Sequence, residues 1–103
     1  MPETIAQDIK QSELSSTLET TGATLVDLRT PEEIAKGMII GAKTVDFFGD
    51  DFMTQMEQFP KDEALVLYCA SGGRSAKAMK MLNKSGWEEI YNLLGGYGEY
   101  VPN

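Results

Sequence analysis

The stretch that decides the fold covers residues 64–75 and reads Ala-Leu-Val-Leu-Tyr-Cys-Ala-Ser-Gly-Gly-Arg-Ser. Its first five residues form a continuous apolar run without alternation, which is typical of a central strand buried on both faces of a sheet. The small residues that follow predict a loop. From Ser75 to Lys84, alanines together with Met79 and Leu82 predict an amphipathic helix. A buried strand that leads through a loop into a helix indicates an α/β fold with a parallel sheet.

The rest of the chain repeats this alternation of short apolar runs and helical patterns. Ser12 is the predicted cap of a first helix whose apolar face holds Leu14 and Leu18, and Pro60 ends a helix with Phe52, Met56 and Phe59 at helical spacing. We expect helices at residues 11–20, 30–37 and 50–59, strands at residues 24–28 and 89–92, and a tight connection at 39–45 into a further strand. The pattern predicts a small α/β domain.

Length and charge restrict the class of protein. The 103 residues suit one domain, spanning residues 1–103, that buries roughly 65% of the surface exposed by its unfolded chain. The formal net charge is −7, whereas phosphate binding requires clustered Lys and Arg. We therefore expect neither nucleic acid nor an anionic membrane as a partner.

The chain has one cysteine, Cys69, and no histidine. A lone cysteine forms no internal disulfide and offers no dithiol pair for redox chemistry, so its chemistry requires an outside partner. The absence of histidine excludes Ser-His and Cys-His activation and every imidazole metal site. We predict a protein without a metal or an organic cofactor.

No export signal or membrane span is visible in the sequence. Residues 1–4 have neither a basic region nor an apolar run, and no stretch approaches the roughly 20 apolar residues of a membrane span. We expect a soluble protein, cytoplasmic by default, since a leader removed earlier leaves no trace here.

The loop after residue 68 predicts a site for an anion. Its small residues lead directly into a helix, so several backbone N–H groups can converge on one point. Cys69 lies at the edge of this point, in the field of those amides and of Arg74, which favours the thiolate over the thiol. Gly72 and Gly73 supply φ values and a close backbone approach that a β-carbon would obstruct. The cysteine is a predicted nucleophile that needs no general base.

Cys69 also admits a structural interpretation, because free cysteines are among the most buried residues and usually pack as small hydrophobes. Two observations favour chemistry. The residue follows the predicted central strand at its carboxyl end, where ligands of open α/β sheets bind. The loop after it is rich in Ser and Gly, which a packing cysteine does not need.

Four segments in order along nearly the whole chain resemble the rhodanese family. They are similar to the family's Asp-x-Arg strand end, Gly-His-Ile-Pro-Gly-Ala segment, active-site loop and closing Gly-Gly turn, and they lie at residues 26–34, 37–42, 68–75 and 92–96. The resemblance implies a three-layer α/β/α fold with a central, mostly parallel sheet of about five strands. It also implies a sulfurtransferase in which Cys69 takes a sulfane sulfur from a donor such as thiosulfate, holds it as a persulfide, and passes it to cyanide or a thiol.

The same resemblance assigns roles to individual residues. Cys69 is catalytic, and the substrate-binding residues are Ala70, Ser71, Gly72, Gly73, Arg74 and Ser75, with the backbone of residues 70–74 as the persulfide cradle. We interpret the chain's other arginine, Arg29, as a structural residue paired with an acidic partner such as Asp27.

Three positions depart from the family pattern. Met38 replaces the usual histidine, Ile40 replaces the usual proline, and Tyr100 stands where a tryptophan is common. We interpret all three as structural positions that leave the loop unchanged.

Three alternatives accompany the sulfurtransferase. Dual-specificity phosphatases and some arsenate reductases resemble rhodaneses in fold, but their loops are one residue longer, and the four residues between Cys69 and Arg74 favour a pocket for one sulfur atom over one for phosphate. A non-catalytic binding module is the second, although inactive relatives usually lose the cysteine. The third is a relay in which Cys69 accepts sulfur from a desulfurase and passes it to a carrier protein. An acidic surface around the loop would favour a basic partner.

Overall fold

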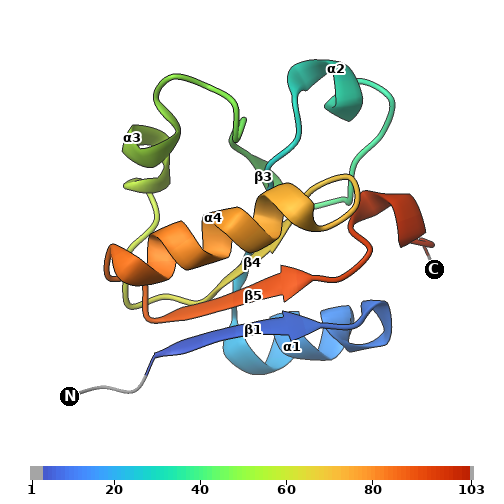
Figure 1. The fold of residues 1–103 in the computed structure, drawn as a ribbon. Helices are drawn as coiled ribbons and strands as arrows, with labels where there is room; N and C mark the ends of the chain where they lie inside the picture. The colour runs from blue at the N-terminus through green and yellow to red at the C-terminus, as the bar shows by residue number, and fades with distance from the viewer. Residues whose placement is uncertain (1–3, 103) are drawn as a thin grey trace.

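The apolar run at the centre of the sequence forms β4 (Leu65–Tyr68), and all four of its residues are buried. In the computed structural model, which describes residues 4–102, β4 is the middle strand of a five-stranded sheet of order β1-β5-β4-β2-β3. Every neighbouring pair of strands is parallel (Figure 1). The predicted central strand and parallel sheet are confirmed.

The elements follow one another along the chain in a strand–helix alternation. They are β1 (Ile5–Ile9), the 3-10 turn η1 (Gln11–Glu13), α1 (Leu14–Thr21), β2 (Thr24–Asp27), α2 (Pro31–Ile34), β3 (Lys43–Thr44), α3 (Phe52–Met56), β4, α4 (Gly73–Lys84), β5 (Glu89–Leu93) and the 3-10 turn η2 (Tyr97–Glu99). The longest helix, α4, has 12 residues. Among the described residues, none of the helices has the length and apolar character that a membrane crossing requires.

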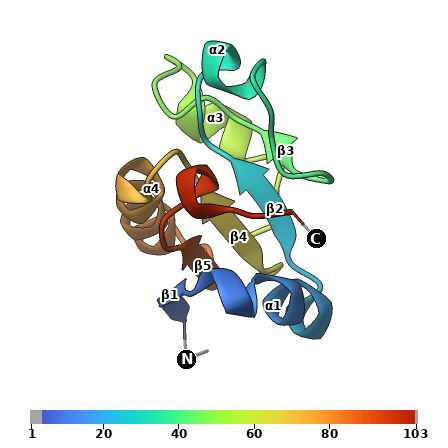
Figure 2. The same ribbon diagram turned by 90° about the vertical axis from the view of Figure 1, so that its right-hand side faces the viewer.

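Alternate side chains of β4 point to opposite faces of the sheet. Leu65 and Leu67 join a core cluster that includes residues of α3 and α4, whereas Val66 and Tyr68 join a cluster that includes Leu14 of α1. Figure 2 shows α4 and α1 on opposite sides of the sheet. A strand whose two faces are both covered must be apolar at every position, which explains the unbroken run. The predicted three-layer α/β/α arrangement is confirmed.

Several element boundaries differ from the predictions. The edge strand β1 was missed, because Gln7 and Asp8 interrupt its apolar residues and only its last residue is buried. Ser12 is not the cap of the first helix, since the chain enters through η1 and the Glu13 carboxylate accepts the Lys10 N–H at 2.8 Å. The helix predicted at 50–59 is limited to α3, although Phe59 still packs in the same core cluster.

The start of α2 matches its sequence signature. The Thr30 hydroxyl accepts the Glu33 N–H, the Glu33 carboxylate accepts the Thr30 N–H at 3.0 Å, and Pro31 occupies the first helical position. This reciprocal capping satisfies donors that the first turn cannot use within the helix. It also fixes the backbone of Glu33, whose side chain points back toward the loop after β4.

The three departures from the family pattern have different environments. Tyr100 packs against the core cluster on the α1 face and stacks with Tyr97, so its structural interpretation is confirmed. Ile40 is 96% exposed in a turn, so its side chain takes no part in the core, and its structural interpretation stays a prediction. Met38 is partly buried.

Candidate active site

The candidate site lies at the carboxyl end of β4, where the strand passes directly into the loop before α4. Gly72 has a φ of 107°, which turns the chain so that its N–H donates to Cys69 Sγ at 3.1 Å. The Cys69 side chain is only 1% exposed. The structure therefore places the thiol inside the loop, against a backbone donor rather than against a general base.

Burial and hydrogen bonding act on the Cys69 thiol in opposite directions. Burial raises its pKa, because it disfavours the charged thiolate, and this is the largest single influence. The Ser75 hydroxyl and the backbone N–H groups of Ser75, Gly72 and Ser71 together outweigh it. The net pKa of Cys69 lies below its ordinary value, which is the direction that activates a thiol as a nucleophile.

Ser75 connects the thiol to a polar network that the sequence analysis did not identify. The Ser75 hydroxyl lies 3.5 Å from Cys69 Sγ and 2.5 Å from the Oδ1 atom of buried Asn92, and its single proton can serve one of them at a time. Asn92 Nδ2 in turn donates to Asp8 Oδ1 at 2.9 Å. Asp8 and Asn92 thereby orient Ser75. A signal was available, since Asn92 is a polar residue between the apolar residues Tyr91 and Leu93 of the last strand.

The remaining predicted loop residues lie in different surroundings. The Ala70 carbonyl accepts the Gly98 N–H at 2.9 Å, and the Ser71 side chain is exposed. A β-carbon on Gly73 would meet nothing within 4 Å, and Gly73 is not among the residues with a positive φ. The conformational need for glycine therefore holds at Gly72, and the same prediction for Gly73 is wrong.

Arg74 forms a two-pronged ion pair with Glu33 of α2. Its Nη1 and Nη2 atoms lie 2.8 and 2.9 Å from the two carboxylate oxygens. Hydrogen bonds from Arg74, and then from the Thr30 N–H, lower the pKa of Glu33 to about 2. Because the charge of Arg74 is offset in this way, the backbone and Ser75 are the main groups that stabilise the thiolate. The ion pair also joins α2 to the first turn of α4.

Arg29 at the end of β2 is paired with Asp27, as predicted from the sequence. Its Nη2 lies 2.7 Å from the carboxylate of Asp27 and 2.7 Å from the Gly37 carbonyl, and both side chains are buried. The guanidinium also lies over the Tyr97 ring, 4.2 Å from its centroid. Arg29 thus ties the segment after α2 and the segment after β5 to the sheet.

The closing turn after β5 supports the loop from behind. The Tyr97 N–H donates to the Cys69 carbonyl at 2.8 Å, next to the bond between Gly98 and Ala70. Gly96 has a φ of 54°, and a β-carbon there would collide with the Cys69 carbonyl oxygen and the Ala70 backbone. Glycine is required at this position because two backbone segments approach each other closely.

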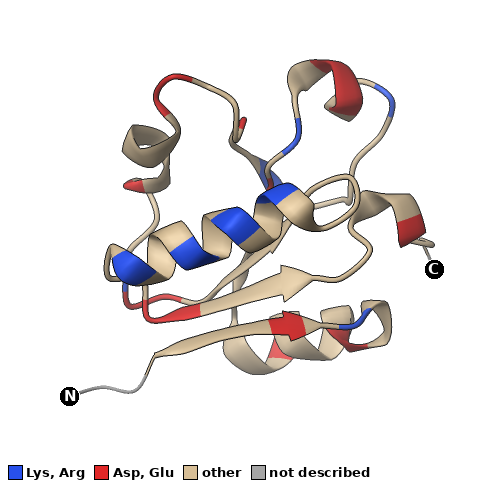
Figure 3. Ribbon diagram, in the orientation of Figure 1, with Lys and Arg blue, Asp and Glu red and all other residues tan. Residues whose placement is uncertain are grey.

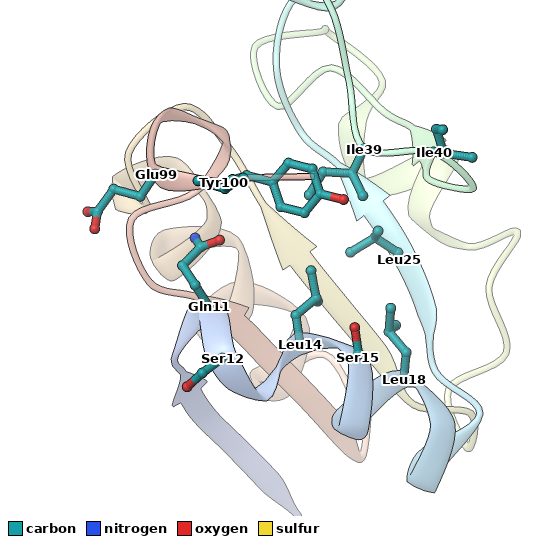
Figure 4. A pocket seen from close by; sticks show the side chains of 11 residues that line it. Gln11, Ser12, Leu14, Ser15, Leu18, Leu25, Ile39, Ile40, Glu99 and Tyr100 are labelled. Atoms are coloured by element: carbon teal, nitrogen blue, oxygen red, sulfur yellow. The ribbon is translucent and has the colours of Figure 1, made fainter. Parts of the chain in front are cut away.

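Two cavities are lined by residues outside the loop. Figure 4 shows one of about 500 Å³ on the α1 face, lined by Leu14 and Leu18 of α1, by Ile39 and Ile40, and by Tyr100 near the C-terminal end. None of residues 69–75 lines it. Another, of about 380 Å³, lies beside Arg29. Across residues 4–102, no group of three His, Cys, Asp or Glu side chains is placed to hold a metal ion. The candidate site is therefore defined by the polar groups around Sγ rather than by a large cavity.

The Cys69 loop, the two arginines and the closing turn all fall within one family match. The sequence profile of the Rhodanese-like domain family matches residues 10–102. The chain belongs to this family. The predicted resemblance to the family is confirmed, and the loop that holds Cys69 lies within the matched residues.

Individual members of the family agree with this assignment. A sulfurtransferase of Allochromatium vinosum is 39% identical over 93 residues, covering 89% of this chain and 85% of the relative. The thiosulfate sulfurtransferase GlpE of Ectopseudomonas mendocina is 35% identical over 81 residues, covering 78% and 72%. A rhodanese-like domain protein of Staphylococcus aureus has the same fold, with a TM-score of 0.80, 33% identity and coverage of 94% and 93%. At the level of the family, these similarities support a rhodanese-type transferase.

Proposed function

We propose that the protein is a sulfurtransferase that carries a sulfane sulfur as a persulfide on Cys69. The observation that carries the proposal is the environment of Sγ, which lies 3.1 Å from the Gly72 nitrogen and next to the Ser75 hydroxyl, with its pKa lowered. No carboxylate hydrogen-bonds to it within residues 4–102. These donors stabilise a thiolate, and they also suit the negative charge on the terminal sulfur of a persulfide.

The reaction consists of two displacements at sulfur. The Cys69 thiolate attacks the outer sulfur of thiosulfate, so that a new S–S bond forms and the bond to the sulfonate breaks, and sulfite leaves with the electron pair. Cyanide or a thiolate then attacks the terminal sulfur of the persulfide, and Cys69 leaves as a thiolate. The cycle needs no metal, no organic cofactor and no external oxidant.

The function requires Cys69 as a free thiolate between turnovers. A reducing compartment preserves this state, whereas an oxidising one favours mixed disulfides of a lone cysteine. This requirement supports the cytoplasm as the proposed location. The proposed small-molecule partners are thiosulfate as a donor and a thiol as an acceptor, and the protein partners are a desulfurase or a sulfur carrier.

The test compares the purified protein with its Cys69→Ser variant in thiocyanate formation from thiosulfate and cyanide. We expect the variant to show only the uncatalysed rate, because oxygen cannot store a sulfane sulfur. Its circular dichroism and melting temperature should stay close to those of the parent protein, since serine fits the same space. A variant that still turned over thiosulfate would show that the sulfur does not pass through Cys69.

A further inference from the structure

The exposed face of α4 carries positive charge only. The chain has nine basic and sixteen acidic residues, yet α4 holds four of the basic ones and none of the acidic ones (Figure 3). We call Lys77, Lys80 and Lys84 the basic face. All three are exposed, and their spacing of three and four residues places them on one side of the helix.

The basic face has no acidic counterpart in the structure. Within residues 4–102, no Asp or Glu lies within 4.0 Å of these three lysines, in contrast to Arg74, which is paired with Glu33. Like charges three and four residues apart on a helix are mildly destabilising. Mixing glutamates into this face would remove the cost, and the chain has many glutamates elsewhere. Lys84 lies in the last turn of α4, where a cation is favourable, but the positions of Lys77 and Lys80 are not explained by folding.

The basic face leads directly to the candidate active site. Arg74 lies in the first turn of α4, three residues before Lys77, and its guanidinium lies 5.3 Å from the centroid of the Phe48 ring. Phe48 is 66% exposed, and Met81, between Lys80 and Lys84, is also exposed. Exposed apolar side chains beside a charged helix face are typical of a protein-binding surface.

We propose that the basic face is the docking site of an acidic protein that exchanges sulfur with Cys69. The proposal rests on the function proposed above and names the class of its partner. From Arg74 to Lys84 the helix extends about 15 Å, a length that thiosulfate cannot span but a protein surface can. The sequence analysis linked an acidic surface around the loop to a basic partner. The surface next to the loop on α4 is basic instead, so the expected partner is acidic.

Docking would bring a cysteine of the partner to the loop. In one direction, the Cys69 thiolate attacks the terminal sulfur of the partner's persulfide, and the partner's thiolate leaves with the electron pair. In the other direction, the partner's thiolate attacks the terminal sulfur on Cys69, and Cys69 leaves as a thiolate. No net oxidation occurs in either direction.

The test uses two synthetic peptides as sulfur acceptors, each with one cysteine, flanked by Asp and Glu in one peptide and by Asn and Gln in the other. The protein is first loaded with sulfur from thiosulfate, and the rate of transfer to each peptide is followed by mass spectrometry at low and high salt. We expect the acidic peptide to react about tenfold faster at low salt, with the advantage lost at high salt.

Two triple variants test whether the preference for the acidic peptide depends on the basic face. Replacement of Lys77, Lys80 and Lys84 by Glu should abolish the preference for the acidic peptide. The matched control replaces Lys10, Lys36 and Lys43, which are also exposed, and should retain the preference despite the same change in net charge. Loading by thiosulfate should change much less than peptide transfer in both variants. Equal rates for the two peptides, or equal behaviour of the two triple variants, would overturn the proposal.

A binding measurement separates this proposal from the proposed function. With Cys69 alkylated, fluorescence anisotropy should still show that the labelled acidic peptide binds the parent protein and not the variant of the basic face. If the peptide binds but no persulfide forms on Cys69, the proposed docking surface is supported and the proposed sulfurtransferase function is contradicted. Two outcomes would contradict an acidic protein partner. One is that the basic face binds tRNA in a gel-shift assay without preferring the acidic peptide. The other is that it mediates salt-dependent self-association of the protein, again without that preference.

Discussion

The carboxyl ends of β2 and β4 lie side by side in the sheet, yet they present opposite chemistry. At the end of β2, the Arg29 guanidinium is buried against the Asp27 carboxylate and the Gly37 carbonyl. At the end of β4, the donors of Gly72 and Ser75 face a single sulfur atom. Donors matched by a carboxylate lock the backbone in place, whereas donors that face a thiol can stabilise a charge that appears during a reaction. One edge of the sheet thus holds both a structural ion pair and a candidate active site.

Breaking the buried ion pair between Asp27 and Arg29 should have the largest effect on stability. Asp27→Asn removes the charge that balances buried Arg29, and we expect the free energy of unfolding to fall by about 3 kcal/mol, because an uncompensated charge remains in the interior. Urea denaturation at neutral pH measures the difference. A loss below about 1 kcal/mol, which is typical of exposed ion pairs, would mean that this ion pair does not hold the end of β2 in place.

The neighbouring glycines of the loop sharpen the comparison at the end of β4. Gly72→Ala forces a side chain into a positive φ, at a cost of roughly 1–2 kcal/mol. It should also slow sulfur loading about tenfold or more, since it displaces the amide that faces Sγ. Gly73→Ala is the matched control and should be neutral or stabilising by up to about 1 kcal/mol, because Gly73 has open space and no positive φ. Equal effects of the two substitutions on loading would contradict the assigned geometry.

The ion pair between Glu33 and Arg74 joins the two regions and should make a smaller contribution. Its side chains are 32% and 18% exposed, so Glu33→Gln should cost no more than about 1 kcal/mol at neutral pH. The pKa of Glu33 is lowered to about 2 from an ordinary value of 4.5. Its contribution is therefore complete above about pH 4.5 and is lost as the pH falls toward 2. Denaturation curves of the parent protein and the variant should converge over that interval. A constant difference between them across this pH range would be inconsistent with the ion pair.

The smallest expected effect concerns the orientation of the Ser75 hydroxyl. Ser75→Ala removes the strongest of the groups that lower the pKa of Cys69, so the midpoint of the alkylation rate against pH should move to higher pH. Alkylation by iodoacetamide, followed by mass spectrometry, gives this profile. Ser71→Ala is the control, because its side chain is exposed and its backbone N–H is retained. If both variants gave the profile of the parent protein, the hydroxyl would have no part in activating the thiol.

Local patterns predicted the features that depend on neighbours in sequence. The unbroken apolar run identified β4, and the small residues after it identified the loop and its cysteine. The pairing of Arg29 with Asp27, two residues apart at the end of β2, was implied by the family resemblance.

Features that depend on the order of strands were not predicted. The network from Asp8 through Asn92 to Ser75 exists because β1 lies beside β5 and β5 lies beside β4. The pairing of Arg74 with Glu33 requires α2 to reach the start of α4, 41 residues later in the chain. The position of β1 at the edge of the sheet also depends on its pairing with the distant β5, which explains why this mostly exposed strand was missed.

The measurement that tests the central claim most directly is the intact mass of the protein after incubation with thiosulfate. The account predicts a gain of one sulfur atom that cyanide removes, and no gain in the Cys69→Ser variant. No cyanide-labile sulfur on the protein, from thiosulfate or from a protein persulfide donor, would contradict the sulfurtransferase and favour a rhodanese-like domain that only binds its partner.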